Sequence, residues 1–421
     1  MKEVYASIIT IGDELLIGQT IDTNSAFIAK ALNEIGIWLK RRVAVGDNKQ
    51  DIISAIDAES KESQIILLTG GLGPTADDIT KPVLCEYFGS TLVKNQDVEN
   101  YIIEIFTKLK RPVGERNLKQ AEVPDNCKVL HNHRGTAPGM WFEKNKVIII
   151  SLPGVPHEMK GLMETSVIPL LKNIEGLPVV LHKTLLTAGI GESVIADKLE
   201  SFETSLPSHI KLAYLPAFGQ VKLRLTSRAN EKDSAEKELK GFFEALKNEV
   251  KDWMVADEDI LLEKVLLEIL QKQSKTLATA ESCTGGYIAH LITSLPGSSK
   301  IFRGSVVAYS NDIKKDLLDV NQSTLEKYGA VSELTVIEMA NGLFKNLAPD
   351  YVVVTSGIMG PDGGSEEKPV GTVWIAAGSK NHLKTTCLHF RFDRKRNIEL
   401  TARGALNFLR KTILEKDLNR D

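Results

Sequence analysis

The first 70 residues alternate between β-branched runs and stretches with apolar residues at helical spacing. A β-branched run over 4–11 is followed by apolar residues that recur every three or four positions up to Gly36. Further β-branched runs over 38–45 and 65–69 flank a second helical pattern over 52–58. This alternation predicts βαβ units in a parallel sheet, whose ligand-binding loops lie at the carboxyl ends of the strands.

From about residue 176 the pattern changes to shorter strands and more charged helices. The expected elements are three strands and two helices, over 179–187, 210–215, 221–227, 191–202 and 231–250. They predict a small α+β module, and it holds no cluster of catalytic residue types. Residues 252–259 are interpreted as a linker.

The last third returns to strands that lead into helices. An amphipathic helix over 261–271 precedes a β-branched run over 275–280, and apolar residues then repeat at helical spacing over 287–295. A longer helix is expected over 332–347, followed by a buried strand over 351–355. The fold class is therefore predicted as α/β.

Length and composition limit the interpretation further. A chain of 421 residues is too long for one ordinary core and predicts about three domains, which we assign to 1–175, 176–255 and 256–421. The 52 lysines and arginines nearly balance 55 acidic residues, so no basic excess favours nucleic acid or an anionic membrane. We expect small-molecule chemistry.

The four cysteines, scattered without a CxxC pair, argue against a zinc site or a disulfide framework. The chain enters a strand pattern directly, and no apolar run reaches the length of a signal sequence or membrane span. A cytoplasmic location is expected.

The turn after the 275–280 run, Thr279-Ala-Glu-Ser-Cys-Thr-Gly-Gly286, carries the first candidate chemistry. Gly285 and Gly286 permit a sharp turn, and the N–H groups of the next helical turn are expected to face whatever lies above Ser282. Such a place suits a nucleophile facing an oxyanion. The alternative is that Ser282 or Thr284 only caps the helix.

A second segment, Gly304 to Lys314, is another strand that ends in polar residues at the start of a helix. Tyr309 and Lys314 are expected to face the Ser282 turn. A lysine that is partly removed from water has a lowered pKa, so it can take the proton of a serine hydroxyl. Cys283 has no evident histidine partner and is interpreted as a packing residue.

Two loops of the first domain carry the other candidate site. One is Gly12 to Gly18 with Asp22-Thr-Asn24; the other runs from Thr69 to Thr80. Phosphate binding is predicted at four positions of the second loop, Gly70, Gly71, Gly73 and Thr75. Asp77 and Asp78 would bind a divalent cation, of unknown identity, that bridges phosphate oxygens. Alternatively the glycines make a turn and the aspartates cap a helix.

Five motifs in the last domain, in order over about 100 residues, resemble the carboxy-terminal domain of the CinA family. They are ESCTGG, YSNxxK, Gly329-Ala-Val-Ser-Glu333, Ser356 to Gly364, and Lys368-Pro-Val-Gly-Thr372. The resemblance implies a nicotinamide mononucleotide deamidase without a cofactor, with Ser282 as nucleophile, Lys314 as general base and Tyr309 orienting it or relaying the proton. Substrate binding is then expected from Thr284, Gly285, Gly286, Gly357, Gly360 and Arg394. Arg394 has two readings, a phosphate clamp and a solvated helix end.

The first domain resembles the molybdopterin-binding fold of the MoaB and MogA proteins, and in detail the amino-terminal domain of CinA. Further matches are Arg116 to Pro124, Asn132, Gly135 to Met140 and Leu152 to Met159. The resemblance implies metal-assisted hydrolysis of ADP-ribose. Glu158 opens a helix after Pro156, where an ordinary first-turn acid is also expected.

The middle module corresponds in CinA proteins to a KH-like linking domain. Because Gly189-Ile-Gly191-Glu is not the GxxG loop with which KH domains grip nucleic acid, we interpret it as a spacer. The expected partners are two small nucleotides, nicotinamide mononucleotide and ADP-ribose, and a second copy of the chain. The alternative function is a regulatory protein that binds a nucleotide or pterin without turning it over.

Overall fold

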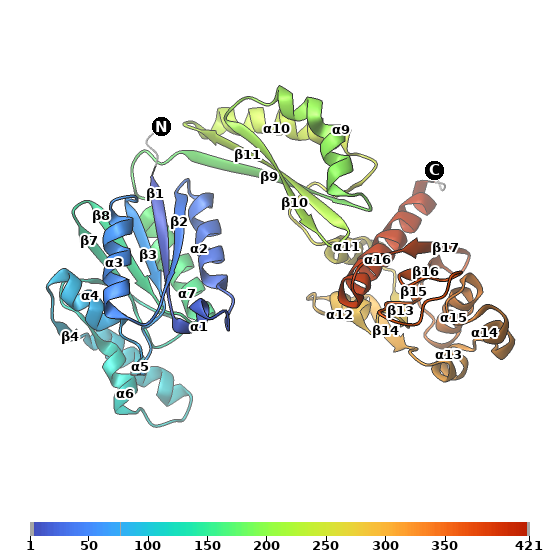
Figure 1. Cartoon of the computed structure of the whole chain (residues 1–421), viewed down its shortest axis with the longest axis horizontal. Coiled ribbons are helices and arrows are strands. Elements are labelled where there is room, and N and C mark those ends of the chain that lie inside the picture. Colours follow the sequence, from blue (N-terminus) through green and yellow to red (C-terminus); the bar gives the residue numbers. More distant parts are fainter. Residues whose placement is uncertain (1–3, 76, 419–421) are drawn as a thin grey trace. The chain divides into compact units, whose positions relative to one another are not determined.

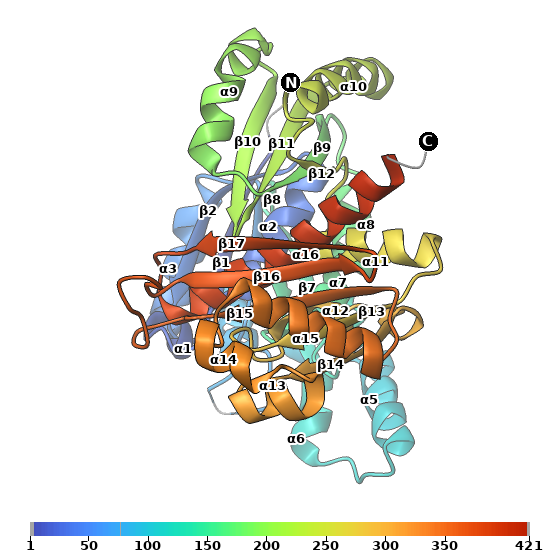
Figure 2. The same ribbon diagram turned by 90° about the vertical axis from the view of Figure 1, so that its right-hand side faces the viewer.

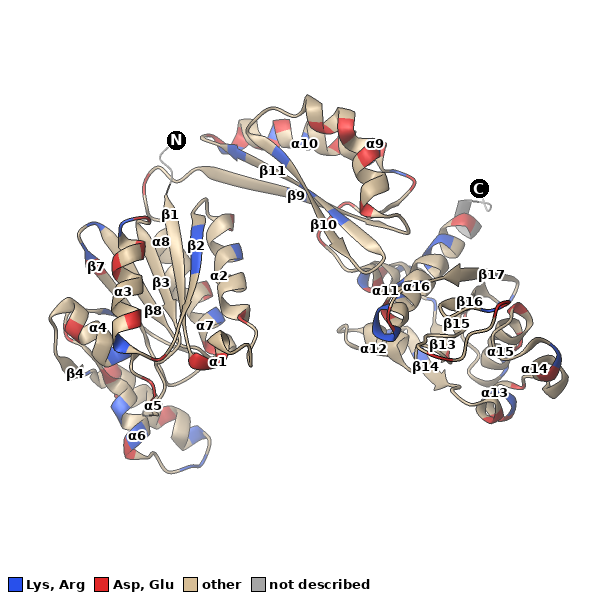
Figure 3. Cartoon of the chain, viewed as in Figure 1, with Lys and Arg blue, Asp and Glu red and all other residues tan. Residues whose placement is uncertain are grey.

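The computed structural model describes residues 4–75 and 77–418. Within them the chain separates into two compact units, Met1–Leu181 with Ser227–Glu236, and His182–Thr226 with Lys237–Asp421. Figure 1 labels their helices and strands, and Figure 3 shows basic and acidic residues interspersed in each unit. No helix in the described ranges is long and apolar enough to cross a membrane.

The first domain contains a six-stranded sheet in the order β2-β1-β3-β8-β7-β6 and a separate β4-β5 pair. The four strands at one side are parallel, as predicted, whereas β6, β7 and β8 pair antiparallel. The strands are β1 Tyr5–Ile11, β2 Trp38–Val45, β3 Ile65–Thr69, β4 Leu92–Lys94, β5 Glu122–Pro124, β6 Lys128–Leu130, β7 Gly139–Lys144 and β8 Val147–Leu152. The helices are α1 Asp13–Leu16, α2 Thr23–Glu34, α3 Lys49–Ser60, α4 Thr80–Phe88, α5 Gln96–Lys108, α6 Glu115–Leu118, η1 Lys119–Ala121, α7 Pro156–Leu162, η2 Met163–Val167 and α8 Ile168–Leu171.

Alternating strand residues bury both faces of this sheet. Ile8 and Leu67 point into a core shared with α2 and α7, while Ile9 and Leu68 point into a second core with α3 and α4. The central strand β3 is apolar except for its last residue and buried at every position, as a strand covered by helices on both faces requires. Asp22 caps α2, since its Oδ1 accepts from the Ser25 N–H at 2.9 Å.

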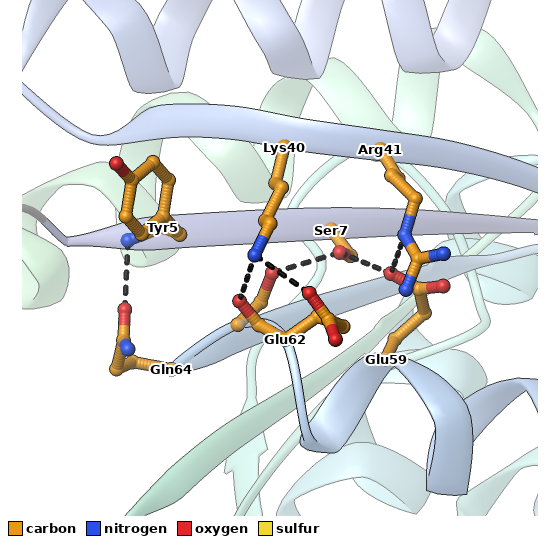
Figure 4. Close-up of polar contacts among 8 residues, drawn as sticks. Tyr5, Ser7, Lys40, Arg41, Glu59, Glu62 and Gln64 are labelled. Atoms are coloured by element: carbon orange, nitrogen blue, oxygen red, sulfur yellow. Dashed lines mark hydrogen bonds and ion pairs between the residues drawn. The ribbon is translucent and has the colours of Figure 1, made fainter.

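A polar cluster lies near the start of β1, away from the Gly12 and Thr69 loops at the opposite strand ends (Figure 4). The Ser7 hydroxyl donates to Glu59 at 2.5 Å, and Arg41 from β2 pairs with the same carboxylate at 3.3 Å. Lys40 pairs with Glu62 at 2.6 Å. These contacts tie β1, β2 and α3 together, so their role is structural.

The middle module is a four-stranded sheet in the order β10-β11-β9-β12 with two helices. Its elements are β9 Val179–Ala188, α9 Glu192–Ser205, β10 Ile210–Ala217, β11 Gln220–Ala229, α10 Lys232–Glu249 and β12 Met254–Ala256. The five predicted elements are confirmed to within a few residues. The linker interpretation of 252–259 is wrong for its centre, because β12 pairs antiparallel with β9.

The last domain is a five-stranded sheet in the order β14-β13-β15-β16-β17, parallel in its first three strands and antiparallel in the others. Helices α11, α12 and α16 pack on one face; α13 and α15 pack on the other, which Figure 2 shows in front. The strands are β13 Leu277–Glu281, β14 Phe302–Val307, β15 Tyr351–Gly357, β16 Thr372–Ser379 and β17 His382–His389. The helices are α11 Leu262–Lys272, α12 Tyr287–Thr293, η3 Ser298–Lys300, α13 Asn311–Leu318, α14 Gln322–Tyr328, α15 Glu333–Asn346 and α16 Arg394–Leu418.

Candidate active site

The carboxyl ends of β13 and β14 bring a serine and a lysine together. Ser282 follows β13 directly, and Lys314 lies in the first turn of α13, which follows β14. Because β13 and β14 are parallel neighbours, their following segments meet at one edge of the sheet. The Lys314 Nζ lies 3.1 Å from the Ser282 Oγ. The sequence predicted this contact.

The Lys314 amine is held by two backbone carbonyls as well. Nζ donates to the carbonyl oxygens of Ala308 at 2.8 Å and Tyr309 at 3.4 Å. The side chain is only 1% exposed. Burial lowers the pKa of Lys314 from its ordinary value, and no carboxylate in the described part of the chain forms an ion pair with it. The neutral amine is thereby favoured.

The two carbonyls also fix where the lone pair of a neutral amine points. A neutral amine has two hydrogens, and Ala308 and Tyr309 can accept both. Its lone pair is then left for the third contact, the Ser282 hydroxyl. This arrangement suits proton transfer from the serine to the lysine.

Cys283 does not compete with Ser282 as a nucleophile. Its thiol is buried in the core under α12, and burial raises its pKa to about 12. A thiol with that pKa is almost entirely protonated near neutral pH, and the thiolate is the reactive form.

Glu281 is the last residue of β13, and its side-chain carboxylate lies at the beginning of α12. One carboxylate oxygen accepts from the N–H groups of Gly286 and Ile288, both at 3.0 Å, and the other accepts from Ala289 at 2.8 Å. The expectation that first-turn N–H groups face the space above Ser282 is therefore wrong, because this buried carboxylate already binds them. The sequence offered one signal for this role, a charged residue at the end of a buried strand.

The helix-cap alternative for Ser282 and Thr284 is wrong too. The residue at the helix-cap position is Gly286, with φ +96°. Because glycine has no side chain, no hydroxyl caps α12. The Thr284 hydroxyl instead lies 2.8 Å from the Thr355 hydroxyl. Among the described residues no carbonyl or carboxylate accepts from the N–H groups of Cys283 and Thr284, so these two remain for a ligand.

Tyr309 and Arg394 contact each other rather than the serine. The Tyr309 hydroxyl accepts from Arg394 at 2.7 Å, and the same guanidinium donates to the Gly360 carbonyl at 2.8 Å. Tyr309 reaches Lys314 only through its backbone carbonyl. Arg394 thus links the segment after β14 to the glycine-rich loop after β15. Gly357, the last residue of β15, pairs with Val373 of β16.

The two predicted loops of the first domain line one cavity of about 450 Å³. Its walls include Gly70, Gly71, Gly73, Asp77 and Asp78 from the second loop, with residues of the first loop and Glu158 opposite. Gly70 lies so close to the Ile11 carbonyl that a Cβ there would approach it to 2.1 Å. Only glycine allows this approach of the two loops.

Three family models match the chain. The Probable molybdopterin binding domain matches residues 7–173, the Damage-inducible protein CinA KH domain 182–256 and the CinA C-terminal domain 259–413. A CinA-like protein of Cytophaga hutchinsonii is 45% identical over 98% of this chain and 99% of its own length. The chain belongs to the CinA family. CinA-like proteins of Flavobacterium psychrophilum and Salinibacter ruber are 42% and 39% identical over 97% of this chain and 99% of theirs.

The matches give this CinA-family chain the three-domain α/β architecture that the sequence predicted. A KH-like middle domain lies between a domain with the molybdopterin-binding fold and the CinA carboxy-terminal domain.

A divalent cation is predicted at Asp77 and Asp78. Both oxygens of Asp78 accept hydrogen bonds: from the Gly73 N–H at 2.7 Å, the Thr75 N–H at 2.9 Å and the Thr75 hydroxyl at 2.5 Å. The described residues contain no group of three or more acidic, histidine or cysteine side chains placed for a metal, so the cation at these two aspartates stays a prediction. Asp78 closes the glycine loop, and this carboxylate takes N–H groups that were expected to bind phosphate.

Proposed function

We propose that this CinA-family protein is a nicotinamide-nucleotide amidase whose nucleophile is Ser282. The observation that carries the proposal is the Lys314 amine: buried, without an ion-pair partner in the described chain, bound to two carbonyls and 3.1 Å from the Ser282 Oγ. A structural lysine at this depth would be expected to pair with a carboxylate. An unpaired buried lysine beside a serine supports base catalysis.

The proposed reaction proceeds in two stages. The Ser282 oxygen attacks the carboxamide carbon while its proton moves to Lys314, and the N–H groups of Cys283 and Thr284 receive the developing oxyanion. The protonated lysine then gives its proton to the leaving nitrogen, so that the C–N bond breaks and ammonia departs. In the second stage water attacks the ester and Lys314 takes the water proton. Lys314 then gives this proton to the Ser282 oxygen as the C–O bond to Ser282 breaks, which releases nicotinate mononucleotide and restores both side chains.

Substrate binding is assigned to the groups around this pair. Arg394 presents a guanidinium suited to the nucleotide phosphate, and a phosphate at this place would compete with the Tyr309 hydroxyl for it. Thr284, Gly285, Gly286, Gly357 and Gly360 form the backbone around the serine and the facing loop. We assign Tyr309 to orientation of Arg394 and, through its carbonyl, of Lys314.

For the first domain we propose hydrolysis of ADP-ribose in the cavity between the two loops. The cavity and the glycine loop that lines it support a nucleotide diphosphate site. The carboxylates around the cavity would repel the diphosphate unless a cation lies between them. The proposal keeps the divalent cation predicted at Asp77 and Asp78, where it would offset the negative charge of the diphosphate.

Release of ammonia from nicotinamide mononucleotide by the purified full chain tests the amidase proposal. We expect ammonia and nicotinate mononucleotide in equal amounts, measured by an ammonia-coupled assay and chromatography. Binding of the nucleotide without any release would instead support the non-catalytic regulatory alternative.

A further inference from the structure

Glu158 is a cavity-lining carboxylate that is held in place from outside its own helix. It lies in the first turn of α7, and its Oε2 accepts from the Asn132 amide at 2.7 Å. The Ala137 N–H also donates to it. Glu158 is therefore a first-turn acid of α7 whose carboxylate is also held by residues outside the helix.

The segment that holds this carboxylate is itself built rigidly. Asn132 is 3% exposed; its amide nitrogen also donates to the Ala137 carbonyl at 2.8 Å, and its oxygen accepts from the Arg134 N–H at 3.0 Å. These contacts fix which way the amide points. A Cβ at Gly135 would lie 2.1 Å from the Glu158 Cδ, so glycine is required where the carboxylate packs.

Three other carboxylates around the cavity have structural roles. Asp78 closes the glycine loop, Asp22 caps α2, and Asp47 accepts from the Asp13 N–H at 3.0 Å. Glu158 differs from these three residues. It lines the cavity, and its carboxylate is held by Asn132 and does not close a loop or cap a helix. Burial also raises the pKa of Glu158, which makes the carboxylate a stronger base.

We propose that Glu158 is the general base of the first domain and that Asn132 positions it, an inference that rests on the proposed diphosphate hydrolysis. Water attacks one phosphorus of ADP-ribose while its proton moves to Glu158. The bond from that phosphorus to the bridging oxygen breaks, and the electron pair stays on the bridging oxygen. The products are AMP and ribose 5-phosphate, and Glu158 releases the proton to solvent.

The test is Glu158→Gln in the full chain, with AMP formation from ADP-ribose measured by chromatography. Glutamine keeps the shape and can still accept from Asn132, but it cannot take a proton. We expect kcat to fall by about 10²- to 10⁴-fold with KM nearly unchanged. Glu164→Gln is the matched control: it removes a carboxylate that pairs with Arg134 at 2.6 Å just beyond α7 and does not line the cavity, so kinetics should be unchanged.

The pH dependence of kcat shows whether Glu158 acts as a base or only shapes the site. Wild-type kcat should fall on the acidic side as Glu158 becomes protonated, and this limb should vanish in Glu158→Gln. In Asn132→Ala the limb should move to higher pH, because the lost hydrogen bond stabilised the charged form. The charged groups around Glu158 are His157 on its own helix and, across the cavity, Glu14, Asp22, Asp47, Asp77 and Asp78.

The outcomes distinguish this inference from the proposed function. Wild-type protein that forms no AMP overturns both. Wild-type hydrolysis together with an active Glu158→Gln variant overturns the base role alone. A raised KM with unchanged kcat would make Glu158 a substrate-binding group and would likewise overturn the inference. Thermal unfolding of each variant checks that the fold is intact.

Discussion

Replacement of Lys314 by arginine distinguishes two possible roles of this residue, a general base and a fixed positive charge. Arginine keeps the charge, but its pKa is too high for it to become neutral, so it cannot take the Ser282 proton. General base catalysis contributes about 10²- to 10⁴-fold, or roughly 3 to 5 kcal/mol of barrier. We therefore expect Lys314→Arg to lose amidase turnover by at least about 100-fold.

The structure also indicates how much folding stability Lys314→Arg should lose. Lys314 is 1% exposed and its amine already contacts Ser282, Ala308 and Tyr309, so a bulkier guanidinium has no free space. Overpacking of this kind costs about 1–3 kcal/mol of stability, which a thermal unfolding curve detects. Lys314→Met removes the base without the added bulk or a buried charge and should be equally inactive.

Two controls complete the test. Lys315→Met changes the next residue of α13, which pairs with Asp312 at the surface at 2.9 Å, and should leave turnover nearly unchanged. In the wild type the rate should rise with pH through the lowered pKa of Lys314, since the neutral amine is the active form. Substantial turnover by Lys314→Arg with a flat pH profile would refute the base assignment.

Two further predictions concern residues whose roles emerged from the structure. Glu281→Gln removes the charge that binds two N–H groups of α12 and that of its cap residue Gly286. We expect the unfolding free energy, measured in urea, to fall by about 1.5–3 kcal/mol and deamidation to fall with it. Asp78→Asn places an amide N–H₂ against the N–H groups of the glycine loop; ADP-ribose hydrolysis should fall while deamidation by the same protein stays at the wild-type rate. Equal loss of both activities would indicate unfolding instead.

The pairing of Ser282 with Lys314 was predictable because it depends on chain order alone. Each residue follows a β-branched run that leads into a helix, and parallel strands carry such positions to the same edge of a sheet. The pattern of apolar positions also placed the buried strands and the helices that cover them. The short strand β12 escaped detection because three residues have too little periodicity to separate them from a linker.

The directions in which the site side chains point could not be predicted from the sequence pattern. Nothing in the order of residues shows that Glu281 turns back over α12, that Asp78 closes its own loop, or that the Tyr309 hydroxyl pairs with Arg394 across 85 positions. The contact of Glu158 with Asn132, 26 residues away, could not be read from the sequence. Gly135 was the available signal, since a glycine can mark a close approach of another group to the backbone.

The central claim, that Ser282 is the nucleophile of an amidase, is tested most directly by comparing Ser282→Ala with Cys283→Ala. Both remove one small buried side chain from the same turn, and both are assayed for ammonia released from nicotinamide mononucleotide. We expect Ser282→Ala to lose turnover by about 10³-fold or more, since only binding and oxyanion stabilisation remain, and Cys283→Ala to stay near the wild-type rate. Near wild-type ammonia release by Ser282→Ala, or its loss in Cys283→Ala with an intact fold, would contradict the assignment.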